Sequence, residues 1–132
     1  QRAQGARGCR RLAQAVALAD GRAESAAETL ARLLLLPHLP GMVPQVRVRD
    51  GKGNVIARLD LADEAVRLAV EADGKRGHTG GQMVARDRAR DRRIESYGWW
   101  TERVTWFDLR RRQTATVARV TARHRQLSLR AA

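Results

Sequence analysis

The sequence predicts an α/β protein in which helices flank a mixed central β-sheet. Two observations lead to this fold class: helix-like and strand-like segments alternate along the chain, and 43% of the 132 residues are hydrophobic. A chain of this length normally forms one domain that buries roughly 65–70% of its unfolded surface. We therefore expect one α/β domain over residues 22–125, with a helical lead-in or linker at 1–21 and a frayed tail at 126–132.

Two helices are expected before the first strand. RRLAQAVALA (10–19) is a short helical segment that ends at the Asp-Gly that follows it. SAAETLARLLLL (25–36) is the firmer of the two, because Ser25 and Glu28 have the spacing of a capping box and a proline stops the helix.

The middle of the chain predicts three strands. QVRVR (45–49) alternates in polarity, DGKGN (50–54) has the composition of a tight turn, and VIARLDL (55–61) returns as a second strand of a hairpin. AVRLAVEA (65–72) is apolar on both faces for much of its length. A central strand that is covered on both sides has this pattern.

The second half of the chain alternates between helix and strand. A glycine-rich loop, GKRGHTGG (74–81), leads into a very basic helix at 82–97, and WWTERVTW (99–106) follows as a strand. Asp108 then caps a last helix that runs to about Arg123. The resulting order is helix, hairpin, strand, helix, strand, helix, which is that of a mixed sheet with helices on its faces.

The charge of the chain favours a polyanionic partner. The 26 Lys and Arg against 14 Asp and Glu give a net charge of +12, as expected of a protein that binds nucleic acid or, failing that, an anionic membrane. Only Lys52 and Lys75 are lysines. Arginine suits bidentate phosphate contacts, although a high-GC genome produces the same bias.

Several protein classes are disfavoured by the sequence. Cys9 is the one cysteine, so we expect neither a disulfide framework nor a cysteine zinc site. No apolar run reaches the roughly 18–20 residues of a membrane span, and no apolar signal-peptide core follows the basic start. We therefore expect a cytoplasmic protein without a membrane partner. Because the chain opens with Gln1 rather than Met, we expect it to be part of a longer protein.

Three acids lie at the ends of predicted strands in this basic chain. Glu71 and Asp73 point to one face of their strand because side chains alternate, and Asp60 ends the preceding strand. If the two strands are neighbours, the three carboxylates meet at one edge of the sheet. They then either hold a hard cation such as Mg²⁺ or Mn²⁺ or pair with arginines, and spacing alone does not decide between the two. The arginines concerned are Arg58, Arg67 and Arg76.

Two long segments, RLDLADEAVRLAVEADGKRGH (58–78) and ARDRARDRRIESYGWWTERVTW (85–106), resemble the very-short-patch-repair-like branch of the PD-(D/E)XK nuclease superfamily. The similarity extends upstream to AESAAETLARLLL (23–35) and covers roughly residues 22–120. The resemblance implies a restriction-endonuclease-like core and metal-dependent hydrolysis of DNA phosphodiester bonds. It makes Mg²⁺ or Mn²⁺ the expected cofactor and DNA the expected partner.

The resemblance also assigns roles to individual residues. It implies Asp60 and Glu71 as metal ligands, with Asp73 as a further ligand. The candidate catalytic residues are Asp60, Glu71, Asp73, Lys75, His78 and Glu28. The candidate nucleic-acid-binding residues are Arg76, Gln82, Arg86, Arg90 and Arg93.

Two positions depart from the pattern of the superfamily. Asp73 stands where a lysine is usual, and Leu59 precedes Asp60 in place of a proline. The usual lysine steadies the nucleophile or the transition state. In this chain either Lys75 reaches into the site or Asp73 binds the metal.

Other candidate residues have two explanations each. Glu28 either completes the capping box with Ser25 or leans toward the metal. His78 either contacts a phosphate or moves a proton, or is a solvated loop residue. Arg86 and Arg90 share a helix face, which either contacts a nucleic-acid backbone or is a solvated surface with ion pairs four residues apart. The tryptophans either stack on bases or pack in the core, and their strand setting favours packing for at least two of the three.

Three functions follow from these observations. The first is a Mg²⁺-dependent DNA endonuclease or nickase, and the second is a non-catalytic nucleic-acid-binding domain with the same fold inside a larger regulator. The third is a structural RNA-binding protein. Domains that resemble this one often end longer bacterial proteins, some similar to abortive-infection antitoxins with a winged-helix regulator in front. The resemblance therefore implies an upstream domain in the same chain.

Overall fold

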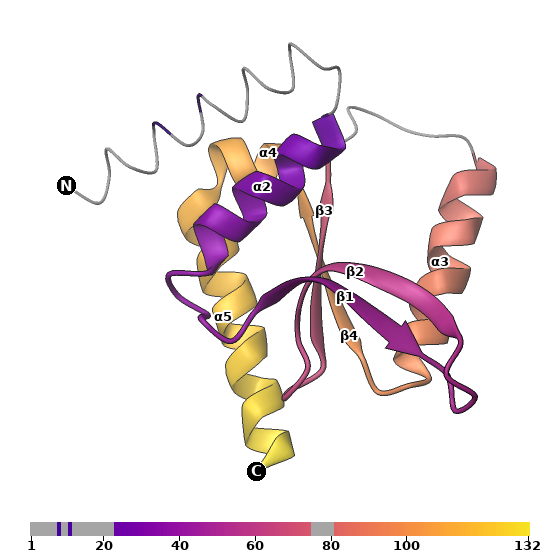
Figure 1. The fold of residues 1–132 in the computed structure, drawn as a ribbon. Coiled ribbons are helices and arrows are strands. Elements are labelled where there is room, and N and C mark those ends of the chain that lie inside the picture. Colours follow the sequence, from indigo (N-terminus) through magenta and orange to yellow (C-terminus); the bar gives the residue numbers. More distant parts are fainter. Residues whose placement is uncertain (1–7, 9–10, 12–22, 75–80) are drawn as a thin grey trace.

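The computed structural model describes residues 8, 11, 23–74 and 81–132 of the chain. Within them, helices and strands alternate as the sequence predicts, and four strands form one mixed sheet with helices on both faces (Figure 1). The predicted α/β class is therefore confirmed. In chain order the elements are α2 (Ala23–Leu35), β1 (Val43–Arg49), β2 (Val55–Asp63), β3 (Leu68–Asp73), α3 (Gly81–Glu95), β4 (Trp100–Thr105), α4 (Trp106–Arg111) and α5 (Gln113–Ala131).

The N-terminal helix of the sheet domain begins earlier than expected. α2 starts at Ala23, so Ser25 lies inside the first turn and Glu28 lies in the second. A capping box requires its acid at the third helical position, and the capping-box prediction for these two residues is therefore wrong. Of the predicted helix at 10–19, all residues except residue 11 lie outside the described part of the chain. None of the helices in the described part is long and apolar enough to cross a membrane.

The predicted β1–β2 hairpin is confirmed, and Asp50 explains its turn. One carboxylate oxygen of Asp50 accepts hydrogen bonds from the backbone N–H groups of Lys52 and Asn54, both at 2.9 Å. These bonds, the one from Asn54 first, hold the pKa of the Asp50 carboxyl below its usual value. Gly53 follows with φ 85°, a conformation that glycine adopts without a Cβ penalty. The residues of the turn itself, 50–54, therefore determine this tight connection.

The third strand is the centre of the sheet. β3 pairs antiparallel with β2 and parallel with β4, and α3 makes the crossover that a parallel pair requires. Leu68, Ala69 and Val70 have no exposed surface, as predicted for a covered strand. The strand begins later than predicted because the chain turns just before it, where Arg67 has φ 54°.

Each face of the sheet carries its own hydrophobic cluster. Helices α2, α4 and α5 cover one face, and α3 covers the other (Figure 1). Trp106 packs against the cluster on the first face and Trp99 against the cluster on the second, so two of the three tryptophans pack as predicted. The second cluster joins α3 to the sheet and consists of Val46, Val48, Ala57, Leu59, Ala62, Ala69 and Ile94.

The C-terminal third differs from the predicted single helix. Thr105 caps α4, and Asp108 is the third helical residue of a capping box in which each side chain accepts from the other's backbone N–H at 3.1 Å. Asp108 is therefore not the cap itself. A separate helix, α5, continues to Ala131, so the expectation of a frayed tail is also wrong. Leu127 packs against the first hydrophobic cluster, which explains why this end stays helical.

A glycine series tests the tight approach before β4. Gly98 has φ 86°, and a Cβ there would lie 2.6 Å from Nη1 of Arg67, the atom that donates to the carbonyl oxygen of Tyr97. We expect Gly98→Ala to lower the free energy of unfolding by roughly 2–3 kcal/mol, measured by urea unfolding.

Two other glycines separate the causes of that loss. Gly53→Ala meets the same positive φ in open space and should cost about 1 kcal/mol, whereas Gly51→Ala should be nearly neutral. Equal losses at Gly98 and Gly53 would show that the contact with Arg67 has no energetic weight.

Candidate functional site

The structure brings Asp60 and Glu71 together. In the β2–β3 ladder Leu61 pairs with Val70, which places Asp60 opposite Glu71 at the next step of the register. Oδ2 of Asp60 also accepts a hydrogen bond from the backbone N–H of Ala72 at 3.0 Å. The two strands are neighbours, as predicted, and the side chains of Asp60 and Glu71 share a hydrogen bond just beyond the paired residues.

Glu71 is buried, and this makes its charge costly. Its exposed fraction is 8%. Burial first, and then the hydrogen bond and the negative charge of Asp60, raise the pKa of the Glu71 carboxyl to about 8. The raised pKa favours the protonated form of the Glu71 carboxyl near neutral pH, and this carboxyl shares a hydrogen bond with Asp60.

Arg90 partly offsets this effect. Its Nη2 lies 3.0 Å from Oε1 of Glu71 and 2.8 Å from the carbonyl oxygen of Arg58. One guanidinium of α3 thus joins β2 and β3 beside the acid pair. Arg90 is a predicted contact for the DNA backbone, and other arginines are the predicted partners for the acids. The contact between Arg90 and Glu71 was not predicted.

A second buried acid shows how differently Glu71 is placed. Glu102 is also 8% exposed, but its carboxylate receives Arg119 at 2.8 Å, Arg123 at 3.1 Å and the indole N–H of Trp100 at 3.0 Å. These contacts fully compensate its charge and fix α5 to β4. Glu71 instead faces one arginine and another acid, an arrangement that structural stability alone does not favour.

The third predicted ligand is not part of this pair. Asp73 ends β3, where its side chain is exposed and the residue pairs with Thr105 of β4. Across the described residues no group of three or more His, Cys, Asp or Glu side chains is arranged to hold a metal ion. The predicted convergence of three carboxylates is therefore observed for two of them.

Glu28 contacts a β1 residue that was not predicted to take part in the site. Nε2 of Gln45 donates to Oε2 of Glu28 at 3.2 Å, which links β1 to α2. Gln45 lies between Pro44 and Val46, whose partners are Leu61 and Leu59, so its position is opposite Asp60. Its φ of 58° is unusual for a non-glycine residue, and nothing in the sequence signals it.

The remaining predicted contacts are partly described. Arg86 and Arg93 are exposed on α3. Arg93 also contributes to the lowered pKa of Asp50, so the hairpin turn lies near the end of α3. Asp91, one of the two acids of α3 that could pair within the helix, contacts Arg103 of β4 at 2.8 Å. The residues of the candidate set that lie outside the described part are Lys75, Arg76, His78 and the side chain of Gln82.

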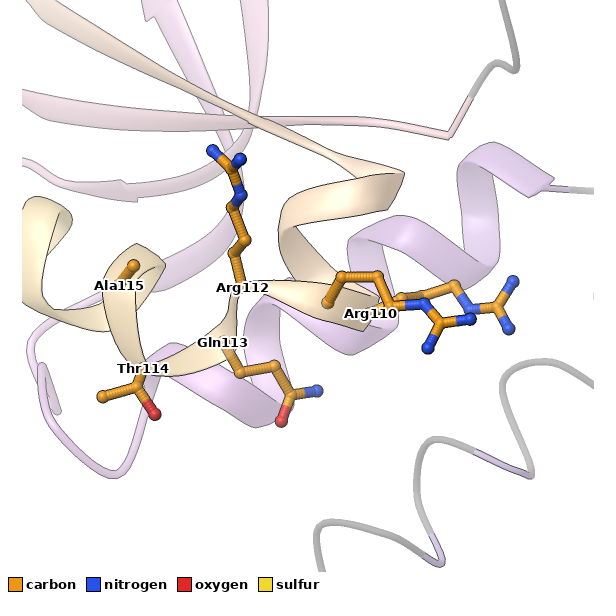
Figure 2. Close-up of a pocket in the computed structure, with 6 residues that line it drawn as sticks. Arg110, Arg112, Gln113, Thr114 and Ala115 are labelled. Carbon is orange, nitrogen blue, oxygen red and sulfur yellow. The ribbon is translucent and has the colours of Figure 1, made fainter.

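An open hollow of about 450 Å³ lies at the junction of α4 and α5. Residues 110–115 line it, and none of them is acidic (Figure 2). Arg112 and Arg110 point in different directions, and the Arg112 guanidinium lies 5.2 Å from the ring centre of Phe107. Because the arginines diverge, they offer no common binding point, and the hollow is separate from the acid pair.

Two curated relatives match this chain. They are the uncharacterized proteins MT2308 and Rv2248 from two strains of Mycobacterium tuberculosis, each 35% identical over 122 residues. The matched residues cover 91% of this chain and 44% of each relative, so the chain spans less than half the length of these proteins. No protein-family profile and no solved structure matches the chain.

The raised pKa of Glu71 predicts a pH-dependent stability. The unfolded chain releases the Glu71 proton near pH 4.5 and the folded protein near pH 8, so folding binds a proton between these values. The free energy of unfolding should therefore fall as pH rises through this window, by on the order of a few kcal/mol. Urea unfolding in EDTA at intervals from about pH 5 to about pH 8 measures the fall.

Glu71→Gln is the matched variant. It keeps the size of the side chain and removes the titration, so its stability should be much less dependent on pH. Because the three histidines are present in both proteins, the difference between them isolates Glu71. Glu64→Gln, a change at an exposed acid, should keep the slope of the parent. An unchanged slope in Glu71→Gln would contradict the raised pKa.

Proposed function

We propose that this chain is a metal-dependent nuclease domain that hydrolyses DNA phosphodiester bonds as an endonuclease or nickase. The observation that carries the proposal is the buried acid pair of Asp60 and Glu71, held face to face in a protein of net charge +12. Two facing acids are costly when both are ionised, and a divalent cation between them removes that cost.

The pair suits a hard cation. Mg²⁺ is commonly bound by one or two carboxylates, with waters and substrate phosphates completing its shell, so two protein carboxylates are a sufficient donor set. When bound, such an ion lowers the pKa of a water and neutralises charge on the phosphodiester. Asp60 and Glu71 hold the ion in this proposal, and Asp73 is the candidate for a further ligand.

Neighbouring residues position the two acids. Arg90 holds one Glu71 oxygen at 3.0 Å, and in this proposal the ion replaces the hydrogen bond between Glu71 and Asp60. The backbone N–H of Ala72 holds one oxygen of Asp60. Glu28 is held beside this region by Gln45. We assign Lys75 and His78 to the phosphate and to proton transfer, as the resemblance implies.

The order of elements supports a restriction-endonuclease-like core. The motif positions of the very-short-patch-repair-like branch fall here on a helix, two adjacent strands, a basic helix and a last strand. Asp60 was expected to end its strand, but β2 continues to Asp63, so both Asp60 and Glu71 lie inside their strands. The structure has α2, β2, β3, α3 and β4 in that order, with Asp60 and Glu71 on the two adjacent strands. We propose that the domain belongs to this nuclease type.

The basic surface supports DNA as the partner. Arg86 and Arg93 are exposed on α3, the helix that also supplies Arg90 to the site. A strand held along α3 would pass the acid pair. Since the aligned region covers 44% of each relative, we propose a further domain in the same chain. We also propose a cytoplasmic location, because the proposed substrate is DNA.

A non-catalytic nucleic-acid-binding domain is the second candidate. It is favoured by Asp73 in the position of the usual lysine and by the contact between Arg90 and Glu71, which compensates one carboxylate without a metal. The absence of a three-ligand cluster among residues 23–74 and 81–132 agrees with it. In such a domain the acid pair is structural, and a divalent metal has no effect on stability.

Thermal melting with and without Mn²⁺ or Mg²⁺ separates the two candidates. A ligand that binds only the folded state adds about 2.7 kcal/mol at 100 times its Kd, which raises Tm by roughly 10 °C in a domain of this size. We expect this shift in the parent and its loss in Asp60→Asn. Asparagine keeps an oxygen that can accept from Ala72 N–H, so the fold is preserved.

Cleavage assays on the same proteins complete the test. The parent should nick or cut plasmid DNA only with metal, Asp60→Asn should be at least a hundredfold slower, and Glu95→Gln, a change at an exposed acid on α3, should match the parent. Metal stabilisation without cleavage would leave a metal-binding domain that is not a nuclease. No stabilisation in any variant would favour the non-catalytic domain.

A further inference from the structure

Two arginines face each other directly on the β1–β2 hairpin. Arg47 pairs with Arg58 in the antiparallel register, so their Cβ atoms lie about 4.5–5.5 Å apart on the same face. Both side chains are exposed. None of the ion pairs observed in the described part of the chain involves either guanidinium, so the pair concentrates two positive charges at one point of the surface.

This face of the hairpin lies opposite the face that packs into the second hydrophobic cluster. Val46, Val48 and Leu59 are buried in the cluster that contains Ile94 of α3. Because side chains alternate along a strand, Arg47 and Arg58 lie on the opposite side of the ribbon. The inner face of this segment thus supplies the packing that holds the strands, and the outer face presents the two cations to solvent.

The arrangement has a cost without a compensating contact inside the described chain. Like charges directly opposite each other on neighbouring strands destabilise the pair. A threonine or an acid at either position would remove the repulsion without disturbing the packed face. An anion between the two guanidinium groups removes it as well, because each guanidinium can donate two hydrogen bonds to phosphate oxygens.

The pair is next to the candidate site. Arg58 precedes Asp60 by two residues on β2, a separation of about 6.6 Å along the strand. The carbonyl oxygen of Arg58 accepts from the same Arg90 guanidinium that contacts Glu71. The backbone that carries the arginine pair is thus fixed to the backbone that carries the acid pair.

We propose that Arg47 and Arg58 form a clamp for one backbone phosphate of a bound nucleic acid. The clamp is separate from the predicted α3 arginines. It would add a second phosphate contact to the nucleic-acid strand beside the acid pair. Its nucleic-acid ligand rests on the proposed function, but the clamp does not require that the domain cleaves. A broad anionic membrane surface is a poorer match, because the exposed hairpin face presents one focused pair of cations next to a buried acid site.

Salt-dependent binding of the whole chain tests the clamp. Fluorescence anisotropy with a labelled DNA duplex in EDTA, from about 50 to about 300 mM salt, gives both the affinity and the slope of log K against log salt. We expect Arg47→Gln/Arg58→Gln to weaken binding roughly tenfold and to reduce the slope by about 1, the value for one lost phosphate contact.

The matched control is Arg125→Gln/Arg130→Gln. It removes the same two charges from exposed positions on α5, and its slope and affinity should stay close to those of the parent. The hairpin variant relieves a like-charge contact, so its Tm should equal or exceed that of the parent. Lost binding with an unchanged Tm therefore reports a lost contact rather than unfolding.

The outcomes separate the clamp from the proposed function. Unchanged binding by the hairpin variant overturns the clamp, as does an equal loss in the α5 control. Retention on anionic vesicles through the pair, with no binding to DNA, also overturns it. If the parent binds DNA through the pair but does not cleave it with metal, the proposed catalysis fails and the clamp stands.

Discussion

The burial of the Glu71 carboxyl beside Asp60 is the constraint on which the site depends. Glu71 keeps 8% of its surface exposed and faces another acid, and its pKa rises to about 8 in consequence. The β2–β3 register brings the two acids close together. Arg90 of α3 donates a hydrogen bond to Glu71, and the backbone N–H of Ala72 donates one to Asp60. A protein with 26 basic residues has many ways to neutralise an acid, and it does so fully at Glu102. It does so only in part at Glu71.

The fold could be predicted where local chemistry decides it. The hairpin turn follows from Asp50 and the glycines around it, and the central strand follows from its continuous apolar run. The same local reasoning failed at helix ends. It placed a cap at Asp108, whereas Thr105 starts α4 and a second helix follows. Long arginine-rich segments carry weak start and stop signals, so packing of residues such as Leu127 decides where the helix ends.

The candidate site could be predicted as far as strand alternation and adjacency allow. These two rules bring Asp60 and Glu71 together, and the structure shows them facing each other. Arg90 and Gln45 were not expected at these places, because their contacts join elements 17 to 32 residues apart in the chain. Asp73 is also on the face that strand alternation predicts, but it lies at an exposed strand end. Alternation predicts the face on which a side chain lies and does not predict how close that side chain comes to the other acids.

The acid pair connects the fold to both candidate functions, and the proton on Glu71 distinguishes them. A cation can bind Glu71 only after that proton leaves, so metal binding near neutral pH must release it. A purely structural acid pair keeps the proton and does not bind the metal. The arginine clamp on the hairpin is compatible with either case, because it grips a phosphate whether or not a bond is broken.

The most direct measurement is isothermal titration of Mn²⁺ into the parent near pH 7 in buffers of different ionisation enthalpy. The slope of heat against ionisation enthalpy gives the number of protons released. With a Glu71 pKa of about 8, we expect close to one proton released per ion bound, and none in Glu71→Gln. Saturable binding without proton release, or no binding at all, would contradict the role of this pair as a metal site.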